Sequence, residues 1–233
     1  MTDEHPSAQL PLDLARGPGM SRDELVVTGA NAAAIALIDR WPDWQTPVVV
    51  LAGPAGSGKS HLAAIWTEAA HASATDPRRI GPDAISVAAS GGAVVVDGVE
   101  AGIDETGLFH LINAAREGGG HVLLTSRRFP AAWGVRLPDL ASRLKAATIV
   151  EIAEPDDLLL TAVVTKLFAD RQVQVEPHVV SYIVNRIERS LSTAMNVVER
   201  LDQAALSRKT RITRGLAAEI IGAVDAGQGD LDL

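Results

Sequence analysis

Gly53-Pro54-Ala55-Gly56-Ser57-Gly58-Lys59-Ser60 is the stretch of this chain that decides the fold. It fits the pattern G-x-x-x-x-G-K-[ST], a loop whose backbone N–H groups surround nucleotide phosphates. The apolar run 47–52 before it predicts a buried strand, and the run that begins at His61 predicts a helix. Unpaired N–H groups and the dipole at the start of that helix both favour a bound anion. The stretch from Gly53 to His61 therefore predicts a nucleotide-binding site.

The charged and hydroxyl groups around this loop have distinct expected roles. Lys59 is expected to neutralise charge on the β- and γ-phosphates, and the Ser60 hydroxyl to ligate Mg²⁺. Asp97 ends the apolar run 93–96, where an acid would hold Mg²⁺ through water or through Ser60. Many ATPases of this type carry a second acid next to it to polarise the attacking water, but this chain has Gly98. We therefore expect weak intrinsic hydrolysis.

Composition limits the class of protein. The chain has 233 residues, 47% of them hydrophobic, which is enough for one α/β domain with a smaller appendage. It has no cysteine, which excludes disulfides and thiolate metal sites and favours a cytoplasmic location. The six histidines are scattered, so we expect no further metal site. The first residues lack the features of a signal peptide, and no apolar run approaches the ~20 residues that span a membrane.

The sequence changes character near residue 153. Before it, apolar runs that end near residues 52, 97, 126 and 152 alternate with helical patterns, which predicts an α/β fold with a parallel sheet and ligands at its carboxyl edge. After it, only helical patterns follow, with starts near Pro155, Pro177, Ser190 or Ser192, and Thr213. We therefore expect four parts: a tail over 1–22, a nucleotide-binding domain over 23–153, a helical domain over 154–226 and a tail over 227–233.

Several polar residues outside the loop have two interpretations each. A hydroxyl of Thr125 or Ser126, at the end of the third predicted strand, would contact the γ-phosphate or cap a turn. Arg143, on a helix at the domain rim, would reach a neighbouring molecule's nucleotide or form a rim salt bridge, and its position alone favours the salt bridge. One of Arg186, Arg189 and Arg200 would fold back onto the nucleotide; otherwise they are solvated helix charges.

Two further segments suggest partners. Gln9, Leu10, Leu12 and Leu14 lie in a polar stretch that Pro11 keeps extended, so they would occupy pockets on another protein or pack on their own domain. The run 208–214 is the one dense basic segment, and it would contact DNA or an acidic partner or simply carry the charges that favour a helix end. The net charge of −8 argues against a surface that wraps DNA.

The order of these motifs resembles the AAA+ ATPases of the DnaA initiator family from Asp23 to about Ala223. The resemblance rests on four stretches, which are 56–61, 94–97, 124–126 and 140–144. We find no counterpart of the initiator's C-terminal DNA-binding domain. An ATPase domain and helical lid that follow a Gln-Leu-Pro-Leu-Asp-Leu tail are similar to the Hda-type regulatory inactivators within that family, in which a like tail binds the sliding clamp.

The resemblance implies a role for each matching residue. It makes Gly53, Gly58, Lys59 and Ser60 the phosphate loop, Asp97 the magnesium acid, Ser126 the sensor and Arg143 a finger that acts in trans. The lid arginine of the family falls at Ser192, with Arg189 as its substitute. The resemblance also implies ADP or ATP with Mg²⁺ as cofactors. The clamp ligands it implies are Gln9, Leu10, Leu12 and Leu14.

The resulting expectation is a negative regulator of replication initiation. With the DNA-loaded sliding clamp of DNA polymerase III, it would stimulate hydrolysis of the ATP bound to DnaA, and it would touch DNA mostly through the clamp. The main alternative is a self-oligomerising DnaA-type ATPase that acts in initiation or remodelling. Two further classes compete with these: a small-molecule P-loop kinase, and a non-catalytic DnaA-binding protein with a structural nucleotide.

Overall fold

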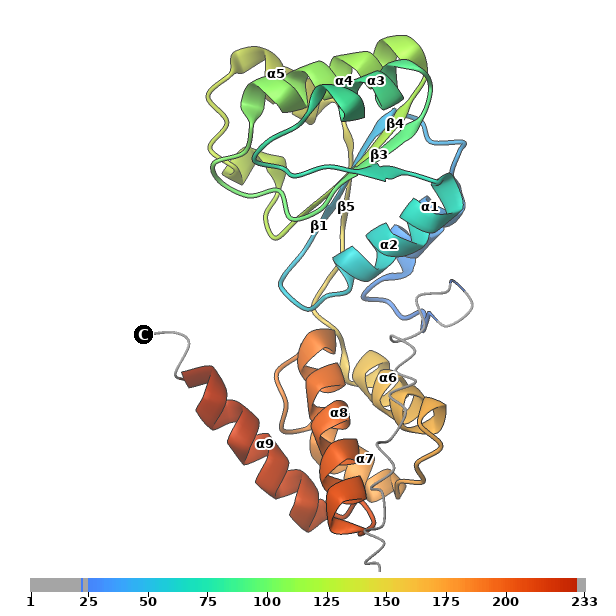
Figure 1. Ribbon diagram of the computed structural model, residues 1–233, viewed down its shortest axis with the longest axis vertical. Helices are drawn as coiled ribbons and strands as arrows, with labels where there is room; N and C mark the ends of the chain where they lie inside the picture. Colours follow the sequence, from blue (N-terminus) through green and yellow to red (C-terminus); the bar gives the residue numbers. More distant parts are fainter. Residues whose placement is uncertain (1–21, 23–24, 230–233) are drawn as a thin grey trace, which may run out of the picture.

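The computed structural model describes residue 22 and residues 25–229, and within them an α/β part is followed by a helical part (Figure 1). We call residues 25–153 the base and residues 154–229 the lid. Each has a hydrophobic core of its own: two clusters of apolar side chains flank the sheet of the base, and a third fills the lid. The predicted change of character near residue 153 is thus the change from sheet to helices.

The strands of the described base form one parallel sheet in the order β2-β3-β4-β1-β5. The predicted parallel sheet is confirmed. In the register, Ala52 lies beside Ser126 on one side and Glu151 on the other, so the loop after Ala52 leaves from the carboxyl edge. The strands are β1 (Val48–Ala52), β2 (Ser73–Ala74), β3 (Ala93–Val96), β4 (His121–Ser126) and β5 (Thr148–Glu151).

Helices cover both faces of this sheet, because strand side chains alternate between the faces. Val50 and Leu124 pack on the face that carries α3, α4 and α5, whereas Val49 and Leu123 pack with α1 and α2 on the other (Figure 1). The helices of the base are α1 (Ala32–Asp39), α2 (Lys59–Ala70), α3 (Pro82–Ala89), α4 (Glu105–Gly118) and α5 (Pro138–Lys145), with a 3-10 turn over Pro130–Ala132.

Two details of the base differ from the expectation. No sequence signal predicts a regular element in the polar stretch 73–82, which holds the exposed edge strand β2 and leads into α3 at Pro82. The helix after the phosphate loop begins at Lys59, two residues before the predicted start, because Gly58 takes a left-handed conformation directly before it. Short, small-residue segments such as 82–89 have weak periodicity, so their structure depends on packing against the sheet.

The lid consists of α6 (Asp157–Asp170), α7 (Pro177–Val184), α8 (Leu191–Arg208) and α9 (Arg214–Gly229) within the described residues. Its helix starts agree with the predicted capping residues. Ser190, not Ser192, caps α8: its backbone is extended and its Oγ accepts the Thr193 N–H at 3.2 Å. Thr213 Oγ1 accepts the Leu216 N–H at 3.3 Å at the start of α9. In the described part of the chain, no helix has the length and apolar character to cross a membrane.

Asp104 is the residue that caps α4. Its carboxylate accepts the Gly107 N–H at 2.9 Å and the Ile80 N–H at 3.1 Å, so it joins α4 to the segment before α3. Asp104→Ala is expected to lower the free energy of unfolding by about 1–2 kcal/mol, because both N–H groups lose their acceptor. Urea unfolding measures this, and the matched change Asp83→Ala, at an exposed first-turn acid of α3, should alter it by less than about 0.5 kcal/mol. Equal losses of unfolding free energy in the two variants would contradict the assignment of Asp104 as the cap of α4.

Candidate nucleotide-binding site

The phosphate loop runs from the end of β1 to the start of α2 and is fixed from two sides. The Gly53 N–H donates to the Ser126 carbonyl at 3.1 Å, which ties the loop to β4. On the other side, a Cβ at position 53 would lie 2.2 Å from the carbonyl oxygen of Ile152, just beyond β5. Only glycine fits this close approach. The loop therefore sits at the carboxyl edge of the sheet, between two strand ends.

Lys59 lies inside the loop, with 8% of its surface exposed. Its Nζ donates to the Pro54 carbonyl at 2.5 Å and to Ser57 Oγ at 3.2 Å. Burial lowers the pKa of Lys59, the positive charge of Arg127 lowers it further, and the carboxylates of Asp97 and Glu100 oppose both effects. A buried ammonium group that is destabilised in this way, at the start of a helix, suits an anionic ligand such as nucleotide phosphate.

Ser60 and Asp97 meet at the same edge of the sheet. Ser60 Oγ donates to Asp97 Oδ1 at 3.1 Å, and the Thr125 hydroxyl donates to the same oxygen. Thr125 Oγ1 in turn accepts the Gly98 N–H at 2.8 Å, which fixes the chain directly after Asp97. A hydroxyl beside a carboxylate is a set of oxygen donors that fits Mg²⁺, so these two side chains would hold the ion of a bound nucleotide.

The residues after Asp97 direct no acid toward this pair. Gly98 has a φ of 75° and no side chain. Glu100 instead forms an ion pair with Arg127, with 3.2 Å between its Oε1 and the arginine Nε, and both side chains are more than half exposed. The expectation of weak intrinsic hydrolysis rests on this absence of a second acid beside Asp97, and it stays a prediction.

Ser126, the predicted sensor, is buried and already engaged. Its Oγ accepts hydrogen bonds from Trp133 Nε1 at 2.8 Å and from the Arg128 N–H at 3.2 Å. The neighbouring hydroxyl, on Thr125, is the one in contact with Asp97. The sequence left open which of the two hydroxyls serves the site, and the geometry brings that of Thr125 to Asp97. The sensor role of Ser126 stays a prediction.

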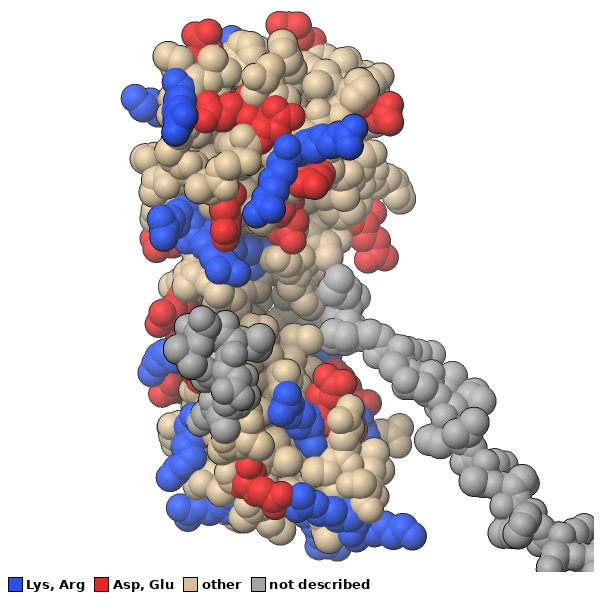
Figure 2. Space-filling view, turned by 60° about the vertical axis from the view of Figure 1, so that its left-hand side comes forward, with Lys and Arg blue, Asp and Glu red and all other residues tan. Residues whose placement is uncertain are grey.

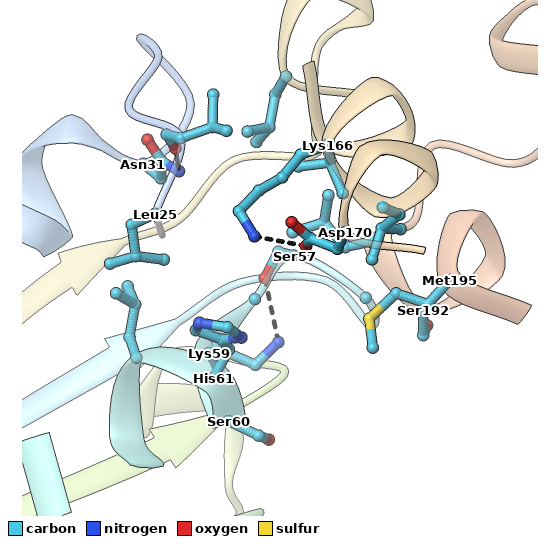
Figure 3. Close-up of a pocket in the computed structure, with 18 residues that line it drawn as sticks. Leu25, Asn31, Ser57, Lys59, Ser60, His61, Lys166, Asp170, Ser192 and Met195 are labelled. Carbon is cyan, nitrogen blue, oxygen red and sulfur yellow. Dashed lines mark hydrogen bonds and ion pairs between the residues drawn. The ribbon is translucent and has the colours of Figure 1, made fainter. Parts of the chain in front are cut away.

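A cavity of about 430 Å³ lies between the base and the lid, next to the phosphate loop (Figure 3). This volume is in the range of small-ligand sites, and apolar side chains from both sides line it. Leu25 belongs to the base, and Leu159 and Met195 belong to the lid. The loop residues that reach the cavity are Gly56, Ser57, Gly58, Lys59, Ser60 and His61, whereas Gly53, Pro54 and Ala55 do not line it.

The start of α8 closes the cavity by direct contact with the phosphate loop. The Leu191 N–H donates to the Gly56 carbonyl at 2.8 Å. A Cβ at position 56 would lie 2.0 Å from Ser190 Oγ, and Gly56 has a φ of 69°, so only glycine fits here. The lid thus rests on the loop that would hold the phosphates, and a ligand on this loop would touch both parts of the protein.

Sequence analysis missed two charged residues of the cavity. Lys166 and Asp170 line it from α6, and an ion pair of 2.6 Å joins Lys166 Nζ to Asp170 Oδ2 (Figure 3). Charges four residues apart on a helix are an ordinary surface pattern, so nothing in the local sequence distinguishes them. Their position depends on how the lid packs on the base, which no local pattern reports.

The remaining predicted residues lie outside the cavity. Arg189 forms an ion pair with Asp157 at 3.0 Å, both side chains are exposed, and Ser192 occupies the cavity wall instead. Arg143 is half-buried in the last turn of α5, on the opposite face of the sheet from α2, and it forms no ion pair with any described residue. The predicted clamp ligands Gln9, Leu10, Leu12 and Leu14 lie outside the described residues.

Comparison with known proteins adds independent evidence. Residues 161–221 match the family model described as the lid domain of Hda. The chromosomal replication initiator protein DnaA of Thermomicrobium roseum is 25% identical over 226 aligned residues, which cover 84% of this chain and 47% of that protein. The chain spans about half the length of the curated relatives it matches.

Solved structures share the fold. Domain III of DnaA from Thermotoga maritima superposes with a TM-score of 0.74 at 15% identity, over 89% of this chain and 97% of that one. The AMPPCP-bound DnaA of Aquifex aeolicus superposes with a TM-score of 0.66 at 16% identity, over 83% and 69%. The expected AAA+ base with a helical lid is confirmed. The chain is similar to DnaA, and its residues 161–221 are similar to the lid domain of Hda.

Proposed function

We propose that this protein is a nucleotide-bound regulator of replication initiation that, together with the DNA-loaded sliding clamp, stimulates hydrolysis of the ATP held by DnaA. The match of residues 161–221 to the Hda lid family and the relation to DnaA support a role in DnaA-dependent replication. The observation that carries the finer proposal is the position of Arg143, away from the cavity of its own chain and without an ion-pair partner among the described residues.

The protein's own nucleotide, ADP or ATP, would occupy the phosphate loop and the adjoining cavity. Lys59 would neutralise phosphate charge, while Ser60 and Asp97 would hold Mg²⁺. The contact between Leu191 and Gly56 supports a structural role for this ligand, because a molecule on the loop bears directly on the start of α8. The nucleotide would then set the angle between base and lid. Because Gly98 stands where many ATPases have a second acid, hydrolysis would be slow and the nucleotide would stay bound.

Arg143 would act on a second molecule. It lies at the end of α5, just before β5 begins, and so near the amino edge of a sheet whose carboxyl edge carries the phosphate loop. A guanidinium group placed there can enter the nucleotide site of a neighbouring DnaA and stabilise charge on the transferring phosphoryl group. The tail from Gln9 to Leu14 would bind the clamp and raise the local concentration of the base near DnaA.

One alternative has an observation in its favour. Lys59 lies inside the loop and Ser60 contacts Asp97, and these contacts support a self-oligomerising ATPase as the second candidate. In that case Arg143 would complete the site of an identical neighbour. Robust hydrolysis by the protein without DnaA would favour this alternative, whereas hydrolysis that requires DnaA favours the regulator.

Lys59→Ala tests the nucleotide site. The variant is expected to bind ADP about 10- to 100-fold more weakly, because the protein can no longer make a charge-assisted hydrogen bond to the phosphates from this position. Isothermal titration calorimetry with Mg²⁺ and ADP measures this, and Lys145→Ala, at an exposed lysine of α5, is the matched control. An affinity equal to that of the wild type would mean that the nucleotide binds elsewhere.

Arg143→Ala tests the finger. With clamp, DNA and ATP-bound DnaA, the wild type is expected to accelerate ADP formation. With the variant, the rate of ADP formation is expected to be about 10³-fold lower, or equal to that of DnaA alone if the acceleration is smaller than this. The exposed Arg136, changed to Ala, is the matched control and should retain full stimulation. Undiminished stimulation by Arg143→Ala, with ADP affinity unchanged, would falsify the assignment.

The tail is tested by clamp binding. The double change Leu12→Ala and Leu14→Ala is expected to abolish capture of the clamp in a pull-down while ADP affinity stays the same, because the tail would lose its two apolar anchors. Val27→Ala, at a side chain that is 51% exposed, serves as control and should bind normally. Clamp capture by the double variant would contradict this role and would mean that these leucines pack on their own domain instead.

A further inference from the structure

We propose that the end of the lid that lies away from the base binds the phosphate backbone of duplex DNA. The surface, which we call the distal lid surface, surrounds the end of α8 and the start of α9, at the lower end of the molecule (Figure 1). Lys and Arg side chains gather along this lower end in the space-filling view (Figure 2). Four exposed cations on it have no ion-pair partner among the described residues: Arg186, Lys209, Arg211 and Arg214.

The charges on this surface are not balanced. None of the four cations forms an ion pair with a residue in the described ranges, 22 and 25–229. Two nearby acids are already paired with other arginines: Asp202 lies 3.9 Å from Arg171, and Glu219 lies 2.5 Å from Arg208. A groove lies between the segments 172–179 and 202–214, and among the acids of the described residues that line it, this leaves Glu176 to oppose the four cations. The surface therefore has an excess of positive charge although the whole chain has a net charge of −8.

Two of the cations share one aromatic ring. The guanidinium carbon of Arg186 lies 3.9 Å from the centre of the Tyr182 ring, and that of Arg214 lies 4.7 Å from it. Attraction to the ring holds each of them in place, but the two like charges repel each other. A phosphate group near both arginines would reduce this repulsion, and each arginine keeps its contact with the ring.

The groove beside them favours phosphate over a peptide. It has a volume of about 780 Å³, and Lys209, Arg211 and Arg214 line it. Amide and hydroxyl groups, which also donate to phosphate oxygens, complete its walls at Gln172, Gln174, Thr210 and Thr213. Protein partners need apolar anchors in such a groove, and among its described residues Leu206 is the one large exposed apolar side chain. A DNA backbone can bind such a groove without apolar anchors.

The test is fluorescence anisotropy of a short labelled duplex with the full chain, across a series of salt concentrations. The wild type is expected to bind at low salt, with an affinity that falls steeply as salt rises. The distal variant combines Lys209→Ala, Arg211→Ala and Arg214→Ala. It is expected to bind about tenfold or more weakly, and its slope of log K against log salt should fall by up to about 3, because each of the three cations would neutralise one phosphate.

A control variant with the same change in net charge shows whether DNA binding depends on the distal lid surface or only on the charge of the whole protein. It combines Arg78→Ala, Arg79→Ala and Arg116→Ala, three exposed arginines of the base. The control should bind the duplex like the wild type, and both triple variants should keep the thermal unfolding midpoint. Equal loss in both variants, no loss in the distal variant, or binding of polyglutamate without binding of the duplex would overturn the proposal. The assay contains neither clamp, DnaA nor nucleotide, so its outcome is independent of the proposed regulatory activity.

Discussion

The contact between the phosphate loop and the start of α8 is the constraint on which the rest of this structure depends. The Leu191 N–H binds the Gly56 carbonyl, and the Ser190 hydroxyl occupies the space that a side chain at position 56 would need. Ser190 is also the cap of α8, so one residue both begins the helix and seats it on the loop. The lid, which has its own core, is thereby positioned over the carboxyl edge of the sheet.

The base carries candidate functional residues at two opposite edges of its sheet. At the carboxyl edge, Lys59 and Ser60 line the cavity that both parts of the chain enclose, and Ser60 contacts Asp97. At the other edge, Arg143 stands on α5 beyond the reach of that cavity. In the proposed function, a ligand at the first edge would stabilise the shape of the protein, while the arginine at the second would act on a neighbouring molecule.

Local patterns predicted most of the fold and one half of the site. The strands that end at Ala52 and Ser126 and the helix start at Thr213 follow from short-range signals, and the structure confirms them. The phosphate loop follows from such a signal too, and the structure places it at the carboxyl edge of the sheet. The other half of the site could not be predicted, because Lys166 reaches the cavity only through the packing of lid on base. Ser126 shows the same limit: its strand end was predicted, but its bond with Trp133 depends on how the 3-10 turn over Pro130–Ala132 folds back onto the strand end.

A crystal structure of the protein with Mg²⁺ and ADP tests the central claim, that base and lid together form a nucleotide site, most directly. We expect the phosphates within hydrogen-bond distance of Lys59 Nζ, the ion beside Ser60 and Asp97, and the nucleoside in the cavity between Leu25 and Met195. A nucleotide bound elsewhere, or a lid whose α8 has left the phosphate loop while the nucleotide remains on it, would contradict this account.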